Sequence, residues 1–344
     1  MKLTMQNIAE KAGVSRYAVS AVIRNDFSSK RVSKEKQERI RNLIKQYNFI
    51  PNETAQKLVN KKTRTITLVV PSYLFFESEF NTILTHTLQE YLMDHNYTLQ
   101  VTSLATSFKE NRLIQHIHTD GIVIMFWQDT FIPIIKQLCG LEKPVLTLRG
   151  KCGLEGVSNV YIDNRAGMYD LTKALIAAGH RNIAHVNAHH TDVYHEEGLA
   201  GIRAAVQETK GITFRDFKTR VDFNNPTTSQ RLIDIGKRGL HQVQKEFPRA
   251  TAIMFNDDLE AMGAVKEARQ VGIAVPGALS VTGNGGFPVA EGNTIGISTT
   301  ESKAPETGQK AGEIMLHCLA GNSSQQVGIQ TKAVIKESIG TLTQ

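Results

Sequence analysis

A dense group of side chains that could bind a metal lies in the second half of the chain. Four histidines and two glutamates fall within thirteen residues: His185, His189, His190, His195, Glu196 and Glu197. Imidazole and carboxylate groups are common zinc ligands, but this spacing matches no recognised zinc pattern. We expect a loop whose side chains are solvated or contact a small molecule, and we predict neither a metal nor a cofactor.

Other patterns that could carry catalysis are also weak. The segment Gly283-Asn284-Gly285-Gly286 follows a predicted strand, but it lacks the GxGxxG spacing and a clear helix after it, so it is a poor phosphate site. No serine, histidine and aspartate stand in the context of a nucleophile elbow. The sequence therefore argues against an enzyme.

Two side chains near the N-terminus could read DNA. Arg16 can pair with both acceptors of a guanine, and Tyr17 can donate to a base or a phosphate. On an isolated helix, the simpler alternative is that both are solvated. The interpretation therefore depends on the elements that hold them.

Those elements form a helix-turn-helix pattern. Thr4, Ser15 and Ser33 can each cap the start of a short helix, and Gly13 suits the end of the first one. Apolar residues recur at helical spacing after each cap: Ile8, Ala9 and Ala12; Val19, Val22 and Ile23; Ile40, Leu43, Ile44 and Tyr47. Arg16 and Tyr17 open the second helix, which is the part of a recognition helix that contacts base edges.

The distribution of charge supports DNA binding. The first 64 residues hold 15 Lys and Arg against 5 Asp and Glu, a net charge of +10, whereas the other residues hold 25 against 28 and carry −3. A basic tail could also serve solubility, but a tail would not carry helix signals. Such asymmetry is expected of a nucleic-acid-binding module joined to a neutral domain. Phosphate contacts or a solvated basic face suit Ser15, Ser20, Lys30, Arg31, Lys34 and Arg41.

This region resembles the LacI/GalR family of bacterial repressors. The specific matches are 8–15 (IAEKAGVS), 18–20 (AVS), 47–52 (YNFIPN) and 55–58 (AQKL). Looser matches follow at 177–184 (AAGHRNIA), 255–258 (FNDD) and 272–276 (GIAVP). The resemblance implies a homodimeric repressor that binds a pseudo-palindromic operator and is controlled by a small-molecule effector.

The resemblance also implies a hinge helix after the headpiece. Pro51 suits the first turn of a short helix whose apolar residues, Ala55, Leu58 and Val59, are too few to stabilise it alone. In the family this helix pairs with that of the second subunit, and a leucine at the position of Leu58 wedges into the minor groove. The alternative is an exposed leucine without a function. The predicted DNA-contacting residues are Thr4, Ser15, Arg16, Tyr17, Ser20, Arg24, Lys30, Arg31, Lys34, Asn52 and Leu58.

The headpiece departs from the family pattern in three places. Ala21 stands where most members have an arginine, and Arg24 stands where an asparagine is common. The loop 26–31 is a few residues longer than usual. We therefore expect base reading to depend more on Arg16 and Tyr17, and the operator to differ from the common one.

From Thr65 onward, β-branched runs alternate with amphipathic stretches. We predict strands at 66–70, 98–102, 121–126, 145–148, 183–186, 252–255 and 279–282. We predict helices near 79–95, 108–118, 130–139, 164–178, 197–209, 227–246 and 257–271. This alternation implies parallel sheets covered by helices, and two doubly wound lobes fit the length better than one sheet.

The predicted fold class is therefore α/β, with an all-α helix-turn-helix headpiece and a two-lobed, doubly wound parallel-sheet core like that of periplasmic binding proteins. The expected domains are a headpiece at 1–47, a linker with the hinge helix at 48–64, and an effector-binding and dimerisation core at 65–344. The resemblance implies crossings between the lobes near 162, 295 and 328. One lobe then holds 65–162 and 296–328, and the other holds 163–295 and 329–344.

Open α/β sheets bind ligands beyond the carboxyl ends of their strands, and the family places a sugar or a nucleobase between the lobes. The candidate effector-binding residues by position are Tyr73, Phe80, Arg149, Asp163, Phe223, Asn256, Asp257 and Asn284. Asp257 could equally be only a charge at a helix N-terminus.

The core also departs from the family pattern. Gly198 stands where many members have an arginine, Arg149 where an aspartate is frequent, and the segment 283–286 lacks a common acidic residue. These changes disfavour a plain hexose. An anionic ligand held by Arg149 and a regulator without effector response are the alternatives.

Three classes of function are therefore weighed: a DNA-binding regulator, a solute-binding protein and a cytoplasmic enzyme on a sugar or nucleoside. The headpiece and the missing signal peptide disfavour the second, and the missing catalytic set disfavours the third. Cys139, Cys152 and Cys318 are odd in number and far apart, and no apolar run approaches the ~18 residues that cross a bilayer. We predict a cytoplasmic protein without a membrane partner.

Overall fold

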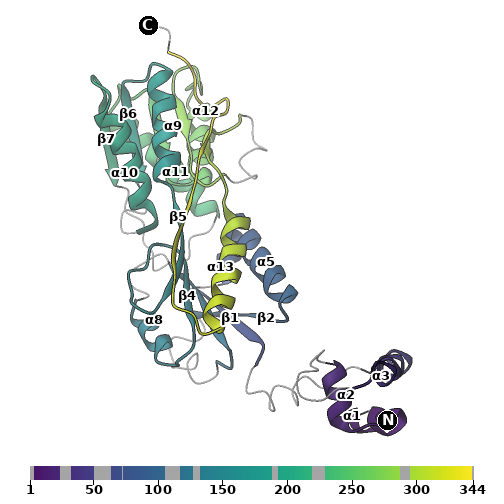
Figure 1. Ribbon diagram of the computed structural model, residues 1–344. Helices are drawn as coiled ribbons and strands as arrows, with labels where there is room; N and C mark the ends of the chain where they lie inside the picture. The colour runs from purple at the N-terminus through teal and green to yellow at the C-terminus, as the bar shows by residue number, and fades with distance from the viewer. Residues whose placement is uncertain are drawn as a thin grey trace. The chain divides into compact units, whose positions relative to one another are not determined.

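The protein folds into two compact units, Met1–Thr63 and Arg64–Gln344. The computed structural model describes residues 4–23, 32–49, 63–71, 73–104, 117–126, 132–187, 193–218, 229–286 and 295–342. In these residues the first unit is helical, and the second contains two parallel sheets with helices on their faces (Figure 1). The predicted fold class is confirmed.

The helices described in the N-terminal unit are α1 (Met5–Ala12), α2 (Arg16–Ile23) and α3 (Lys34–Gln46). The hydroxyl oxygens of Thr4, Ser15 and Ser33 each accept a hydrogen bond from a backbone N–H three residues later, at 3.3, 3.2 and 3.4 Å. Gly13 ends α1 in the left-handed conformation, with φ of +65°. The predicted starts of all three helices and the predicted end of the first are thus confirmed.

The apolar stripes of these helices meet in one small core. Its buried members are Ile8, Ala9, Ala12, Val19, Val22, Ile40 and Phe49. The predicted place of Tyr47 in this core is wrong. Because α3 ends at Gln46, the Tyr47 side chain is 38% exposed, and the Lys11 ammonium lies 5.0 Å from its ring centre. Phe49 is buried instead.

The first sheet of the second unit has six parallel strands in the order β11-β5-β4-β3-β1-β2. Their bounds are β1 Thr65–Val70, β2 Thr98–Ser103, β3 Gly121–Phe126, β4 Val145–Arg149, β5 Ser158–Asp163 and β11 Gln326–Gln330. Its helices are α5 (Glu79–Asp94), which follows the 3-10 helix η1 (Tyr73–Glu77), α8 (Ile132–Cys139) and α13 (Ala304–Leu319). We call this part the first lobe.

The second sheet has four parallel strands in the order β7-β6-β8-β9. They are β6 Asn182–Asn187, β7 Thr213–Lys218, β8 Ala252–Phe255 and β9 Ser280–Thr282. The helices of this second lobe are α9 (Arg165–Ala177), α10 (Val193–Gln207), α11 (Ser229–Glu246) and α12 (Asp258–Gln270). A short antiparallel pair, β10 (Thr299–Thr300) and β12 (Ala333–Val334), lies beside α9.

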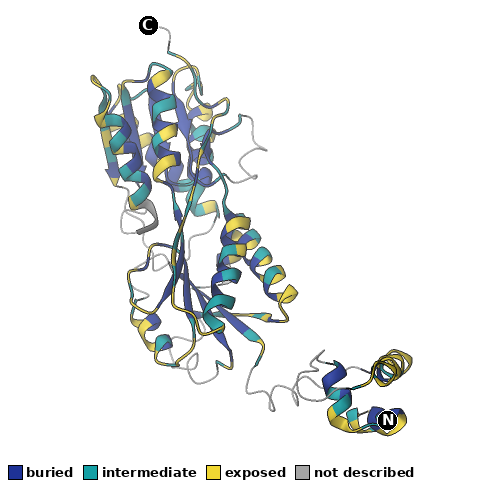
Figure 2. Ribbon diagram, in the orientation of Figure 1, coloured by how far each residue is buried: buried dark blue, intermediate teal, exposed yellow. Residues whose placement is uncertain are grey.

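Both sheets are covered on both faces, as a doubly wound fold requires. Neighbouring residues of β1 point to opposite sides, so Leu68 packs in the core with α5 and α13, and Val69 in the core with α8. The second sheet is covered by α9 and α10 on one face and by α11 and α12 on the other. Figure 2 shows the resulting buried central strands and the exposed outer sides of the helices.

Helices α11 and α12 pack unusually close. A Cβ atom on Gly236 of α11 would lie 1.8 Å from the Glu260 carbonyl oxygen of α12. A Cβ atom on Gly263 of α12 would lie 2.0 Å from the Ile233 carbonyl oxygen of α11. Both positions therefore require glycine, because each faces the backbone of the other helix.

A fully buried histidine ties the C-terminal segment to the second sheet. Nδ1 of His180 lies 2.9 Å from Thr251 Oγ1, and Nε2 lies 3.1 Å from the Gly340 carbonyl oxygen and 2.8 Å from Ser280 Oγ. Burial lowers the pKa of His180, against the raising effect of the Gly340 carbonyl. The lowered pKa favours the neutral form of His180, and both of its ring nitrogens take part in these contacts.

Most predicted elements of the core are present within two residues of their predicted ends. Helix α10 begins four residues before its prediction, and the predicted helix 108–118 lies mostly outside the described residues. Five strands, β5, β7, β10, β11 and β12, and helix α13 were not predicted from the sequence. The chain passes between the lobes at residue 164, at 301–303 and at 331–332, so the second crossing lies a few residues later than 295. Within the described ranges, no helix is long and apolar enough to span a bilayer.

Candidate functional site

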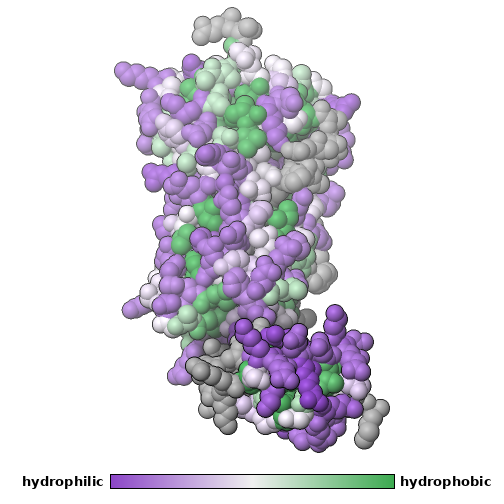
Figure 3. Space-filling view, turned by 45° about the vertical axis from the view of Figure 1, so that its right-hand side comes forward, coloured by the Kyte–Doolittle hydropathy of each residue, from purple (hydrophilic) through white to green (hydrophobic). Residues whose placement is uncertain are grey.

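Helix α2 exposes the two residues predicted to read bases. Arg16 and Tyr17 form its first turn, and Tyr17 is 46% exposed. The opposite side of the helix, with Val19 and Val22, is buried in the small core. The N-terminal unit, at the bottom of Figure 3, presents a mostly hydrophilic face. A short helix with one side buried in the core and polar residues exposed at its start has the form of a recognition helix.

Ala21 also lies on the buried side of α2. Its side chain is 2% exposed, although the family commonly places an arginine at this position. In this chain the position contributes to packing, so the polar surface of α2 is confined to its start.

The other predicted DNA contacts fall into two groups. Thr4 and Ser15 use their hydroxyl oxygens for helix caps, Ser20 is half-buried, and Lys34 is exposed at the start of α3. The structure neither adds nor removes a DNA contact for them. The remaining predicted residues lie outside the described residues: Arg24, Lys30, Arg31, Asn52 and Leu58.

In the first lobe, Arg149 and Phe80 come together. Arg149 ends β4 with φ of +76°, and its guanidinium donates to Asn81 Oδ1 at 2.9 Å and lies 5.2 Å from the Phe80 ring centre. Phe80 is 5% exposed and belongs to the core that contains α5 and α13. The cation is thus fixed at the carboxyl end of a strand, whereas Phe80 is mainly a packing residue. The side chain of Tyr73 and the whole of Phe223 lie outside the described residues.

Asp163 lines a separate pocket of about 300 Å³. The other residues of this pocket are Arg165, Ala166, Tyr169, Gly201, Ala204 and Gln330. The Asp163 carboxylate accepts a hydrogen bond from the Arg165 backbone N–H at 3.0 Å, at the start of α9. None of the other predicted effector-binding residues lines this pocket.

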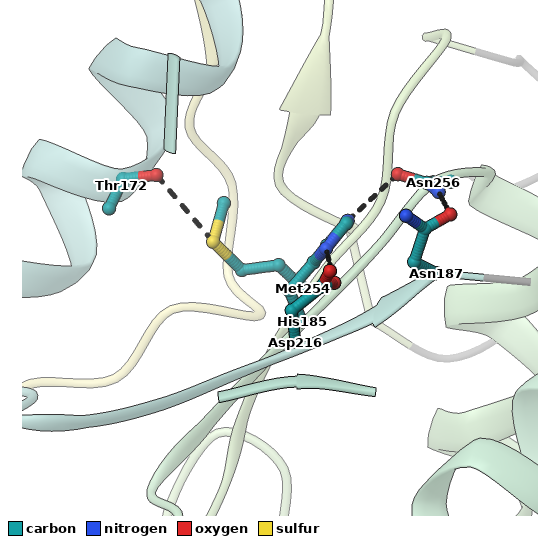
Figure 4. Close-up of polar contacts among 6 residues, drawn as sticks. All are labelled: Thr172, His185, Asn187, Asp216, Met254 and Asn256. Atoms are coloured by element: carbon teal, nitrogen blue, oxygen red, sulfur yellow. Dashed lines mark hydrogen bonds and ion pairs between the residues drawn. The ribbon is translucent and has the colours of Figure 1, made fainter. Parts of the chain in front are cut away.

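In the second lobe, four polar side chains form a buried relay (Figure 4). His185 Nδ1 lies 2.7 Å from Asp216 Oδ1, and His185 Nε2 lies 2.8 Å from Asn256 Oδ1. The carboxamide nitrogen of Asn256 donates to Asn187 Oδ1 at 2.9 Å. The expectation that His185 lies in a loop is wrong, because it is a fully buried residue of β6.

The relay crosses three neighbouring strands. In the sheet register His185 of β6 faces Asp216 of β7 and Met254 of β8, while Asn187 ends β6 and Asn256 directly follows β8. The sulfur of Met254 accepts a weak hydrogen bond from the hydroxyl of Thr172 in α9, at 3.6 Å. The relay therefore runs along the face covered by α9 and α10 and ends at the carboxyl edge of the sheet.

Asp216 carries a negative charge in this relay. Its partial burial acts to raise the pKa, but the hydrogen bond and charge of His185, helped by nearby Arg203 and Lys218, outweigh it. The pKa of Asp216 is therefore below its ordinary value.

Asp257 and Asn284 are held by the second lobe itself. Asp257 Oδ1 accepts from the Leu259 N–H at 2.8 Å and caps α12, as the helix-terminus alternative expects. Asn284 is 3% exposed, and its Oδ1 accepts from the Thr300 hydroxyl at 2.5 Å. The amides of Gly285 and Gly286 donate to Thr300 and Thr299, so this segment fastens the chain near the second crossing and offers those N–H groups to no phosphate.

The remaining members of the histidine and glutamate group do not converge. Glu197 lies 3.6 Å from Lys151, and Glu196 is exposed. No cluster of three metal-binding side chains occurs in the part of the chain that the structure describes. The side chains of His189, His190 and His195 lie outside it.

Sequence reasoning missed Asp216 and Asn187. A signal was present, because a histidine and an asparagine alternate with apolar residues in β6, and an arginine and an aspartate stand between two phenylalanines in β7. Polar residues in a buried strand need hydrogen-bond partners, which could have prompted a search for them.

A helix-turn-helix unit joined to a two-lobed α/β core defines a class of DNA-binding transcription regulators. Two family models match the chain. "Bacterial regulatory proteins, lacI family" matches residues 4–52, and "Periplasmic binding protein-like domain" matches residues 172–339.

Individual proteins agree with these matches. The chain is 26% identical over 324 residues to the transcriptional repressor PurR of Vibrio cholerae, covering 91% of this chain and 90% of that protein. Its fold is similar to the Lac repressor dimer bound to operator and the anti-inducer ONPF, with a TM-score of 0.78, 20% identity and full coverage of both chains. It is also similar to a CelR–cellobiose complex, with a TM-score of 0.70, 23% identity and coverage of 98% and 99%. The chain belongs to the LacI family: it is a DNA-binding transcription regulator and not an enzyme.

Proposed function

We propose that this regulator is a repressor that binds a pseudo-palindromic operator as a homodimer. A small molecule bound near the carboxyl ends of the core strands would control it. The observation that carries the proposal is the exposure of Arg16 and Tyr17 on the first turn of α2, whose other side is buried. That turn can enter a major groove without disturbing the core behind it.

Sequence preference and affinity would come from different residues. Arg16 and Tyr17 would contact base edges, while Lys34, Lys30 and Arg31 would contact phosphates and fix the position of the headpiece. Leu58 would wedge into the minor groove at the operator centre, which bends the DNA toward the protein. Relatives named as repressors, among them one seen as a dimer on its operator, support this arrangement.

The dimer proposal is supported by the outer edge of the first lobe. β2 is an edge strand, and its Val101 is 43% exposed, while Met93 of the neighbouring α5 is 60% exposed. Exposed apolar residues beside a strand edge that pairs with no other described strand suit an interface with a second copy. We expect Val101→Arg to give monomers in light scattering, and Ile335→Arg, at a residue 52% exposed, to leave the dimer intact.

The effector would contact both lobes. Arg149 at the end of β4 and Asn256 after β8 lie at carboxyl ends of strands, where open α/β sheets bind ligands. Phe80, Asn284 and Asp257 would shape the site through packing and helix capping. A ligand that favours one arrangement of the lobes would change DNA affinity, and DNA would change ligand affinity by the same factor.

The main test is binding of the full chain to DNA. The operator is first enriched from genomic fragments, and its affinity is then measured by fluorescence anisotropy at several salt concentrations. We expect Arg16→Ala to cost about 10-fold or more in operator affinity and to relax the preference at one base pair in each half-site. Lys45→Ala is the matched control. It removes an exposed cation from the last turn of α3, whereas Lys34 lies in the first turn, and it should keep the base preference of the wild type. Equal binding to all sequences by the wild type would refute the proposal.

A second test separates the hinge from the headpiece. Leu58→Ala should weaken binding to the operator much more than binding to random DNA, because the wedge acts only on bent, specific complexes. Lys34→Ala should weaken both and reduce the slope of affinity against salt. Equal losses on both DNAs in Leu58→Ala would contradict the wedge.

A further inference from the structure

The buried relay of the second lobe has a direction. A carboxylate only accepts hydrogen bonds, so His185 Nδ1 must donate to Asp216. Asn256 uses its nitrogen to donate to Asn187, so its oxygen is the atom that faces His185 Nε2, and this nitrogen must donate as well. In this arrangement both ring nitrogens of His185 face acceptor oxygens, so each would carry a hydrogen.

This order of donors and acceptors decides which groups the end of the relay offers to a ligand. Asn187 accepts from Asn256 through its oxygen, which leaves the carboxamide nitrogen of Asn187 at the carboxyl edge of β6 with no acceptor among the described residues. The second hydrogen on the Asn256 nitrogen is likewise not donated to any residue of the relay. The end of the relay at the carboxyl edge of the sheet is made of N–H donors.

A neutral His185 would reverse the pattern. With hydrogen only on Nδ1, Nε2 would need a donor, so the Asn256 carboxamide would turn over. Asn187 would then turn over to donate to the Asn256 oxygen, and its own oxygen would form the outer end. Asp216 opposes this reversal, because its carboxylate lies 2.7 Å from Nδ1 and favours a ring with hydrogen on both nitrogens.

The charges around the relay fit this arrangement. Arg203 and Lys218 are the cations that act on Asp216 and help to keep it ionised. Two other polar residues on the same carboxyl edge, Asp257 and Asn284, are held by α12 and Thr300. In the first lobe, Arg149 adds a cation at the end of β4.

We propose that Asp216 and His185 are positioning residues that set the hydrogen-bond polarity of Asn256 and Asn187, so that the effector site selects a ligand bearing a carboxylate. The inference rests on the proposed effector site at the carboxyl ends of the strands. A carboxylate accepts from several N–H groups at once, whereas a sugar hydroxyl in the same place also needs an acceptor for its own hydrogen. A single buried carboxylate thus selects among ligands without touching them.

The first test needs no ligand. Nitrogen NMR of the full chain with labelled histidine reports whether each imidazole nitrogen carries hydrogen. We expect both nitrogens of His185 to be protonated at pH 7.5 in the wild type, and Nε2 to lose its hydrogen in Asp216→Asn, which has nearly the same shape. Glu267→Gln is the matched control, because it alters a histidine–carboxylate pair of 2.8 Å between His241 and Glu267, outside the relay. A neutral His185 in the wild type overturns the proposal.

The second test uses matched ligands. D-glucuronate is compared with D-glucose, and D-galacturonate with D-galactose, by thermal shift and calorimetry on the wild type. We expect the acid of a pair to bind, and Asp216→Asn to weaken its binding about 10-fold or more, as loss of a charge-assisted hydrogen bond would. Asn187→Asp, which replaces the outer donor by an acceptor, should give the same loss. A neutral sugar that binds as tightly as its acid overturns the proposal.

Failure of this inference and failure of the proposed function can be told apart. Operator binding by the same samples reports on the regulator, and the NMR result reports on the relay. A neutral His185 in a protein that binds its operator refutes the relay alone. A charged His185 in a protein without sequence preference refutes the proposed function alone.

Discussion

Two fully buried histidines lie at opposite ends of one strand and are held in opposite ways. His180 precedes β6, burial lowers its pKa, and its ring nitrogens contact Thr251 Oγ1, Ser280 Oγ and the Gly340 carbonyl oxygen. His185, near the carboxyl end, faces an acceptor oxygen at each nitrogen. The amino end of the sheet uses its histidine to fasten the chain, whereas the carboxyl end uses it to control which hydrogen-bonding groups are presented. Burial alone therefore does not tell the role of a histidine; its partners do.

The largest effect is expected from breaking the amino-end contacts. His180→Leu should lower the free energy of unfolding by about 2–4 kcal/mol, because it leaves Thr251, Ser280 and the Gly340 carbonyl without their buried partner. Urea unfolding followed by circular dichroism measures the change. A loss below about 0.5 kcal/mol would mean that His180 does not fasten the C-terminal segment.

Removing the charge at the carboxyl end should cost less stability. Asp216→Asn keeps the shape of the side chain, which is 12% exposed, so we expect a loss of about 1–2 kcal/mol. The same unfolding experiment gives the value. If this variant is destabilised more than His180→Leu, then the carboxyl-end relay is a structural element first, and the contrast drawn above is reversed.

The two ends should also respond to different ranges of pH. The pKa of His180 is lowered by burial, so the unfolded chain binds that proton first. Its effect is absent above the ordinary histidine value of about 6.5, and stability falls below it by at most about 1.4 kcal/mol per pH unit. The pKa of Asp216 is lowered as well, so its contribution is present above about 3.9 and is lost as the pH falls through the native value.

Unfolding of three proteins across pH 3.5 to 8 separates these ranges. His180→Gln should flatten the fall between pH 6.5 and 5, and Asp216→Asn should flatten the fall below pH 4.5. An unchanged slope between pH 6.5 and 5 in His180→Gln would show that His180 is not the group responsible.

The smallest effect is expected at an exposed pair. His241 is 52% exposed beside Glu267, and exposed pairs contribute less than about 1 kcal/mol. Glu267→Gln should therefore change stability by no more than about 0.5 kcal/mol at any pH in the series. A larger loss would mean that the α11–α12 surface contributes more than its exposure suggests.

The sequence predicted the buried elements well and the edges of the sheets poorly. β3 and β8 have their predicted bounds, because every residue of β8, for example, is buried and apolar. β7 is an edge strand with Arg215, Asp216 and Lys218 among its six residues, and β11 is half exposed, so neither carries a strong apolar pattern. In the headpiece the caps were predictable because each depends on residues three apart.

The candidate site was predictable in position but not in detail. The sequence places Asn256 and Arg149 directly after predicted strands, and the structure places both at carboxyl ends of strands. What each side chain contacts depends on residues far away in the chain: His185 and Asn256 are 71 residues apart, and Asn81 and Arg149 are 68 apart. Local patterns carry no information on such pairs, because only the assembled sheet brings them together.

The reciprocal glycines of α11 and α12 limit how this protein can change over generations. Gly236 and Gly263 each face a carbonyl oxygen of the opposite helix within 2.0 Å of where a methyl group would lie. Backbone atoms cannot be replaced by mutation, so a new side chain at one glycine has no compensating substitution at the other. Substitutions can therefore accumulate elsewhere in the second lobe but not at these two glycines, and the packing of the two helices against each other stays the same.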